Sequence, residues 1–145
     1  MIVRLDHVGV VAHSLEEASA VLVDTLGFPI DTDRTSMPEG NLFRPENTRI
    51  YFVQVGAGET RIEILIPQDT VSGIAKYLAR RGPSLHHLGY AVDDVAEDAR
   101  LLREKGLQQI DLGGLATAAF FYPKSAMGIL TELVPNRRTR QDVIR

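Results

Sequence analysis

The chain contains no cysteine, which excludes disulfides, thiolate nucleophiles and cysteine-ligated zinc. Any bound metal must therefore be held by histidine, carboxylate or amide groups. The sequence also lacks an unbroken run of about 18 apolar residues, the length that a membrane-spanning helix needs. The N-terminus reaches His7 without the apolar core of a signal peptide, so the expected location is cytoplasmic.

Basic residues are not in excess either. The 16 Lys and Arg residues are outnumbered by 19 Asp and Glu residues, which gives a formal net charge of -3. Four arginines gather at the end of the chain (137–145), but no aromatic residue lies among them, so we expect no nucleic-acid partner. The 145 residues, 44% of them hydrophobic, suffice for one compact domain with a sizeable core.

The most informative feature of the sequence is an internal repeat with an offset of 80 residues. Residues 5–9, Leu-Asp-His-Val-Gly, return as residues 85–89, Leu-His-His-Leu-Gly. In a strand, Val8 and Val10 of the first segment would share one apolar face, as would Leu88 and Tyr90 of the second. Each half is therefore expected to open with a strand, at about 3–11 and about 85–92.

A helix is expected after each of these strands. Ser14 with Glu17, and Asp94 with Glu97, have the spacing of a capping box, which marks the N-terminus of a helix. A glycine then stands where each helix would end in a left-handed residue. The expected helices span about 15–25, ended by Gly27, and about 95–105, ended by Gly106.

Each half also closes alike, because residues 61–67 and 129–135 are apolar runs that carry one acid and stop at a proline. Further strands are expected at 49–55 and 118–122, with short ones within 29–46 and 107–115, and a linking helix at 71–81 that stops at Gly82-Pro83. The chain is predicted to be a single α+β domain of paired βαβββ repeats that form one curved mixed sheet around a metal-binding cleft. Its parts are repeat one (about 3–67), the linking helix (about 71–82) and repeat two (about 84–135).

Four polar residues occupy repeat-equivalent positions in these strands. His7 and His87 share a strand face with the glycine two residues later, which leaves space beside each ring. Glu63 and Glu132 each lie in the middle of an apolar strand, where a carboxylate is costly unless it is paired or ligates a cation.

A lone strand histidine is more often structural than a ligand, and a lone mid-strand glutamate is usually exposed. Their repetition favours a metal site formed by His7, Glu63, His87 and Glu132. The metal is expected to be divalent: cobalt, zinc, nickel, manganese or magnesium. His86, on the opposite strand face from His87, is expected to be structural, and His13, in a loop before Ser14, is expected to be solvated.

These motifs resemble the vicinal oxygen chelate (glyoxalase/bleomycin resistance) superfamily. The resemblance rests on Leu-Asp-His-Val-Gly, Ile-Glu-Ile-Leu-Ile-Pro, Leu-His-His-Leu-Gly with Val-Asp-Asp, and Tyr-Pro-Lys-Ser followed by Gly-Ile-Leu-Thr-Glu-Leu, and it covers about residues 4–135. Within the superfamily the chain is most similar to the methylmalonyl-CoA epimerases.

The resemblance implies a metal that chelates a carboxylate and a thioester carbonyl of an acyl-CoA substrate, and so stabilises the enolate left by removal of the α proton. It implies His7, Glu63, His87 and Glu132 as ligands, Glu132 as the residue that also moves the proton, and a homodimer.

The chain departs from the family pattern at several positions. Ile50 stands where some members carry a second acid, so a two-carboxylate mechanism is in doubt. Tyr122 replaces a common histidine, Val21-Leu22 replaces an aromatic pair, and the loop 36–46 is unlike its counterpart. These changes are typical of a relative with an altered substrate.

Two other functions are compatible with the sequence. One is a glyoxalase I-like enzyme that acts on a glutathione adduct or another enolisable substrate. The other is a non-catalytic binding protein of the same fold, although such proteins usually lack the metal ligands. The phosphates of a CoA substrate would need basic residues near the cleft, and the available candidates are Arg34, Arg44, Arg49, Arg80 and Arg81.

Overall fold

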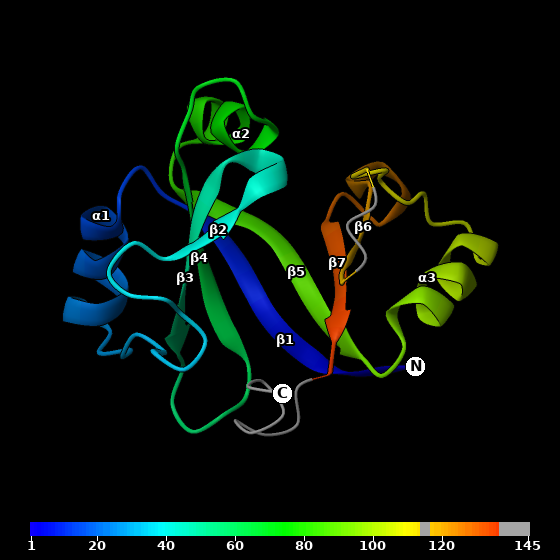
Figure 1. The fold of residues 1–145 in the computed structure, drawn as a ribbon, viewed down its shortest axis with the longest axis horizontal. Helices are drawn as coiled ribbons and strands as arrows, with labels where there is room; N and C mark the ends of the chain where they lie inside the picture. Colours follow the sequence, from blue (N-terminus) through cyan, green and yellow to red (C-terminus); the bar gives the residue numbers. More distant parts are fainter. Residues whose placement is uncertain (114–116, 137–145) are drawn as a thin grey trace. The chain divides into compact units, whose positions relative to one another are not determined.

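A computed structural model describes residues 1–113 and 117–136 (Figure 1). The C-terminal arginines and residues 114–115 of the 107–115 segment lie outside the described residues. The strands are β1 (Ile2–Val11), β2 (Asn41–Phe43), β3 (Thr48–Gln54), β4 (Arg61–Pro67), β5 (Ser84–Val92), β6 (Ala119–Phe121) and β7 (Leu130–Pro135). The helices are α1 (Leu15–Ser19), α2 (Gly73–Arg81) and α3 (Val95–Glu104). Among the described residues no helix is long and apolar enough to cross a membrane.

The seven strands are hydrogen-bonded in the order β2-β3-β4-β1-β5-β7-β6. β5 and β7 run parallel, whereas the pairs β2–β3, β3–β4 and β6–β7 are antiparallel. The predicted α+β fold with one mixed sheet is therefore confirmed. The chain divides into two compact units, a first unit (Met1–His7 with His87–Arg145) and a second unit (Val8–His86).

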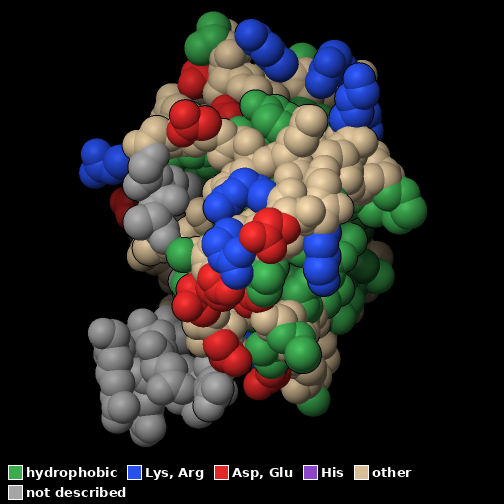
Figure 2. Space-filling model, turned by 90° about the vertical axis from the view of Figure 1, so that its right-hand side faces the viewer, with side chains coloured by type: hydrophobic (Ala, Val, Ile, Leu, Met, Phe, Trp, Pro, Cys, Tyr) green, Lys and Arg blue, Asp and Glu red, His purple; other side chains and the backbone are tan. Residues whose placement is uncertain are grey.

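The core of the first unit lies between α3 and the strands β5, β6 and β7 (Figure 1). It is formed by Val92, Ala99, Phe121 and Leu133. The charged side of α3 faces solvent, and Figure 2 shows basic and acidic side chains interleaved on this side of the molecule. Arg100 forms ion pairs there with Glu97 and Glu104, one turn away on either side.

In the second unit both faces of β4 are covered. Ile64 and Ile66 pack with Ala18 of α1, whereas Leu65 packs with Leu78 of α2. This is the alternation expected of a strand with two buried faces. Glu63 shares its strand face with Leu65, so its carboxylate belongs to a strand with no solvent-facing side.

Both predicted N-caps are present. The hydroxyl of Ser14 accepts the backbone N–H of Glu17 at 3.1 Å, and Asp94 Oδ1 accepts that of Glu97 at 3.0 Å. The reciprocal half of each box differs from the prediction. Glu17 accepts the N–H of His13, one residue before the cap, at 2.9 Å, and the Glu97 carboxylate binds Arg100 instead.

Two predicted elements differ in form from the expectation. The first helix spans the predicted residues 15–25, but it is α-helical only as far as Ser19 and continues as a π-helix over Ala20–Thr25. Its last N–H, from Leu26, reaches the carbonyl of Val21 five residues back. The short strand expected in 107–115 is reduced, in its described part, to one bridge between Gln109 and Phe121.

Replacing the buried Asp31 with asparagine is expected to destabilise the protein. Arg61 Nε donates to its carboxylate at 2.8 Å, and the N–H groups of Asp33 and Arg34 donate at 3.0 and 3.2 Å. Burial raises the pKa of Asp31, but these donors together outweigh it and hold the pKa below its ordinary value. A carboxyl with a lowered pKa stabilises the fold at neutral pH, and that stabilisation disappears as the pH falls through the folded pKa.

We expect Asp31→Asn to cost about 2–3 kcal/mol in urea unfolding at pH 7, because hydrogen bonds to a charged group are lost. The difference from wild type should shrink in acid. Glu39→Gln changes an exposed carboxylate in the same loop and is the control. An equal loss in the free energy of unfolding for both substitutions at pH 7 would contradict the stabilising role of the Asp31 carboxylate.

Candidate metal centre

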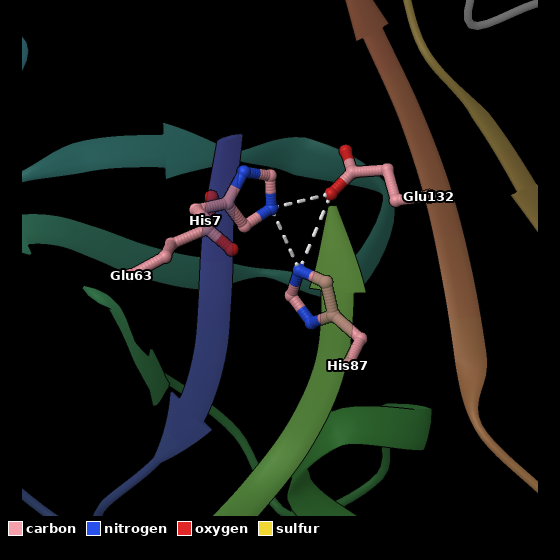
Figure 3. Close-up of side chains that lie close together, drawn as sticks. All are labelled: His7, Glu63, His87 and Glu132. Carbon is pink, nitrogen blue, oxygen red and sulfur yellow. Dashed lines mark hydrogen bonds and ion pairs between the residues drawn. The ribbon is translucent and has the colours of Figure 1, made fainter. Parts of the chain in front are cut away.

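Three of the four predicted ligands come together within the first unit. His7 lies on β1, His87 on β5 and Glu132 on β7, and their side chains are buried, with exposed fractions of 2%, 5% and 8%. The Nε2 atoms of the two histidines are 3.0 Å apart, and Glu132 Oε1 lies 2.8 Å from that of His7 and 3.2 Å from that of His87 (Figure 3).

Strand register explains why Glu132 reaches the histidines. β7 pairs with β5 so that Glu132 lies opposite Gly89, two residues beyond His87 on the same strand face. A Cβ atom on Gly89 would lie 2.1 Å from His7 Cε1, so the His7 ring occupies the space that the missing side chain leaves. The sequence predicted space beside a histidine, and the structure has it. The ring of His7 lies over Gly89, the glycine of the second repeat.

The donor set fits a metal cation. His7 Nε2, His87 Nε2 and Glu132 Oε1 converge, and each of these atoms can offer a lone pair. A single proton among them would make a hydrogen bond in only one of the three close pairs. Ligands about 2.1 Å from a metal and at right angles to each other lie about 3 Å apart, which agrees with the separations of 2.8 to 3.2 Å found here. Nitrogen and carboxylate donors suit divalent first-row metals.

Glu132 carries a carboxylate at neutral pH. Its burial alone would raise its pKa, but the hydrogen bonds and charges of His7 and His87 outweigh burial and lower the pKa to about 2. Oε1 faces both imidazoles, whereas Oε2 points away from them (Figure 3). The ionised form is the one that binds a cation and accepts a proton.

Glu63 is the predicted ligand that belongs to the second unit. It lies in the middle of β4 opposite Phe52 of β3 and is 7% exposed. Ile62 and Ile64 on either side contribute to the apolar core with α1, as the sequence predicted. Glu63 is thus a buried carboxylate in an apolar strand of the second unit, and Figure 3 draws it with the three candidate ligands of the first unit.

Asp6 is a residue of this site that sequence reasoning missed. It is 1% exposed, and its Oδ2 accepts a hydrogen bond from His7 Nδ1 at 2.8 Å. The Asp6 carboxylate therefore binds Nδ1, the nitrogen of the His7 ring that faces away from Glu132. A signal was present in the sequence, because an acid directly before a candidate ligand histidine is a common second partner of that ring.

A cavity of the first unit lies beside Phe120. It has a volume of about 330 Å³ and is lined by residues 109–112 and 118–120. Phe120 lines it and also meets the ring of His87 edge-on, with 6.5 Å between the ring centroids. A small acyl group could therefore lie close to the buried histidines.

The remaining histidines behave as predicted. His86 packs edge-on against Tyr77, with ring centroids 4.7 Å apart, and His13 is exposed and contacts Glu17. Ile50, at the position where some family members carry a second acid, packs against the core around Val11.

The loop 36–46 is anchored at both ends in the second unit. The carbonyl of Pro38 accepts the hydroxyl of Tyr51, and Glu46 Oε2 accepts the N–H of Gly73 at the start of α2. Two of the candidate arginines lie over aromatic rings: Arg34 is 4.3 Å from the Phe52 ring centroid, and Arg81 is 4.7 Å from that of Tyr77.

Substituting Gly89 with alanine is expected to disturb the site without unfolding the chain. The new methyl group would overlap the His7 ring and push Nε2 away from Glu132. We expect the affinity for Co²⁺, measured by calorimetry, to fall by about 10- to 100-fold, the size seen when the support of a ligand is lost.

Gly58→Ala is the matched control for Gly89→Ala, since a Cβ at Gly58 meets its nearest neighbour only at 3.9 Å. Metal-free Gly58→Ala should melt close to wild type, whereas metal-free Gly89→Ala should melt lower because the buried His7 ring must shift. Unchanged Co²⁺ affinity in Gly89→Ala would mean that the His7 ring does not need its present position.

Known proteins were compared with the chain. The profile of the Glyoxalase/Bleomycin resistance protein/Dioxygenase superfamily matches residues 6–120. The uncharacterized protein YqjC of Bacillus subtilis is 26% identical over 90% of both chains. The ethylmalonyl-CoA/methylmalonyl-CoA epimerase of Cereibacter sphaeroides is 29% identical over 92% of this chain and 98% of its own length. A variant of Streptomyces coelicolor methylmalonyl-CoA epimerase, solved with 2-nitronate-propionyl-CoA, superposes with a TM-score of 0.79 at 26% identity, covering 96% of this chain and 98% of its own.

Proposed function

Because the chain belongs to the glyoxalase/bleomycin resistance protein/dioxygenase superfamily, we propose that it is a metal-dependent epimerase of a 2-substituted malonyl-CoA thioester such as methylmalonyl-CoA. The observation that carries the proposal is the convergence of His7, His87 and Glu132 on one point within the first unit. The similarity to two epimerases of such thioesters supports the choice of substrate.

The proposed metal is divalent, and its proposed ligands are His7, Glu63, His87 and Glu132. Glu63 is included because it is the repeat-equivalent of Glu132 and is a buried carboxylate in an apolar strand. Four protein ligands leave two positions of a six-coordinate ion for the two oxygens of a chelating substrate. When bound, the metal supplies positive charge that stabilises the enolate oxygen formed as the α proton leaves.

Glu132 is the proposed acid–base residue. Its Oε1 faces the two imidazoles, so Oε2 is the oxygen that can take the α proton of the thioester. Ile50 has no ionisable proton and cannot return a proton to the opposite face of the enolate, which inversion at the α carbon requires. Removal of the α proton is therefore assigned to Glu132, and the second donor is not assigned to Ile50. The cavity beside Phe120 would hold the acyl group.

The choice of substrate is tested by proton NMR in deuterated water. The proposal predicts rapid loss of the α-proton signal of methylmalonyl-CoA, and no isomerisation of the hemithioacetal of glutathione and methylglyoxal. Turnover of the glutathione adduct alone would establish the glyoxalase I-like alternative. Tight binding of either compound without exchange or turnover would establish a binding protein.

We further propose a two-fold homodimer. β2 is an outer strand of the sheet, and a partner can cover the edge of such a strand. Analytical ultracentrifugation at micromolar concentration should give about twice the chain mass of 16.0 kDa. A single species at the chain mass would contradict the dimer.

A further inference from the structure

We infer that Asp6 is a positioning residue, which holds the His7 imidazole in the tautomer that leaves Nε2 free to bind a metal. The inference rests on the proposed function, because it takes His7 as a ligand. His7 Nδ1 lies 2.8 Å from Asp6 Oδ2, and both side chains are buried. A carboxylate only accepts hydrogen bonds, so Asp6 favours a proton on Nδ1. Glu132 Oε1 lies 2.8 Å from Nε2 and would compete for that proton, whereas a metal bound at Nε2 would take the lone pair there and leave the proton on Nδ1.

The Asp6 carboxylate is held in place by a chain of side chains within the first unit. Arg4 Nη2 lies 3.6 Å from Asp6 Oδ1, and Arg4 Nη1 donates to Asn136 Oδ1. Asn136 Nδ2 in turn donates to Asp93 Oδ1 at 3.0 Å. This series of contacts links His7 with the protein surface and opposes rotation of the Asp6 carboxylate. The ring of His7 is then clamped between Asp6 at Nδ1 and Glu132 at Nε2.

The two histidines are not supported alike, although the repeat relates them. The offset of 80 residues places His86 at the position of Asp6. His86 packs edge-on against Tyr77 in the second unit. The adjacent carboxylate is therefore a property of the first repeat alone, and His86 provides a matched control position for Asp6.

Metal affinity is the first test. Asp6→Asn keeps the shape of the side chain but gives it an amide that can donate to Nδ1 and so move the proton of His7 to Nε2. In calorimetric titration with Co²⁺, Asp6→Asn should bind about 10- to 100-fold more weakly than wild type, as is usual when the partner of a ligand histidine is lost. His86→Asn should bind close to wild type. Equal Co²⁺ affinity of Asp6→Asn and wild type would overturn the inference.

The tautomer of His7 is the second test, and it requires no activity. Long-range ¹H–¹⁵N spectra of the Zn²⁺-loaded protein distinguish a ring with its proton on Nδ1 from one with its proton on Nε2. Wild type should show the Nδ1–H form, and Asp6→Asn should populate the Nε2–H form. A purely structural Asp6 would lower the melting temperature without changing the tautomer, and that result would overturn the inference.

The wild-type spectrum decides the question even if Asp6→Asn does not fold, since a wild-type His7 with its proton on Nε2 contradicts the inference directly. Failure of the wild type to bind Co²⁺ would instead count against the proposed function. The two failures are therefore distinguishable.

Discussion

Replacing Glu132 with glutamine is expected to slow exchange of the α proton of methylmalonyl-CoA by about 10²–10⁴-fold, which is the usual contribution of a positioned acid–base group. The amide keeps the shape of the side chain and can still offer an oxygen to a metal. It cannot accept the α proton. Metal affinity should therefore fall much less than turnover, and deuterium exchange followed by NMR measures the difference.

Glu63→Gln is the matched control for Glu132→Gln. It makes the same chemical change in the same proposed ligand set, but Glu63 is not the proposed acid–base residue. Glu63→Gln should therefore slow exchange of the α proton less than Glu132→Gln does. Equal losses, each in proportion to the metal lost, would make Glu132 a ligand only. The base would then lie elsewhere, and Glu39 would be the next candidate, since Glu46 already accepts the N–H of Gly73.

Replacing His87 with alanine is expected to reduce the affinity for Co²⁺ by about 100-fold or more. This loss is larger than the one expected when only the hydrogen-bond partner of a ligand is removed. His87 Nε2 lies 3.0 Å from that of His7 and 3.2 Å from Glu132 Oε1, so its removal opens one side of the site. Proton exchange should fall in parallel with bound metal, as measured by elemental analysis of the purified protein.

His13→Ala is the control for His87→Ala, because His13 is exposed and contacts Glu17 outside the site. It should keep both metal content and exchange. If His87→Ala bound a full equivalent of Co²⁺ with the affinity of wild type, the proposed ligand set would be wrong.

The strand positions of the candidate ligands could be predicted from the sequence because a strand has a period of two and the repeat supplied each position twice. A single buried glutamate such as Glu132 would have been ambiguous, and its equivalence to Glu63 removed the ambiguity. Local rules also sufficed for the helix N-caps at Ser14 and Asp94, since a cap needs only residues three apart.

Other features depend on contacts between distant residues and were not predictable. Alternation assigns Asp6 to the strand face opposite His7, yet the two side chains meet at 2.8 Å because Asp6 is held next to Arg4. The short strand expected in 107–115 is reduced to a bridge at Gln109 because pairing there depends on Phe121 of β6. The π-helix over Ala20–Thr25 likewise has no signature in the spacing of apolar residues.

The central claim is that a metal bound by His7, Glu63, His87 and Glu132 is required for removal of the α proton of a malonyl-CoA thioester. Its most direct test is the rate of deuterium exchange into methylmalonyl-CoA, measured on chelator-treated protein before and after stepwise addition of Co²⁺. The account predicts negligible exchange without metal and exchange that rises in proportion to bound Co²⁺, with saturation at one ion per chain. Exchange at full rate in the metal-free protein, or no exchange at any Co²⁺ concentration, would contradict it.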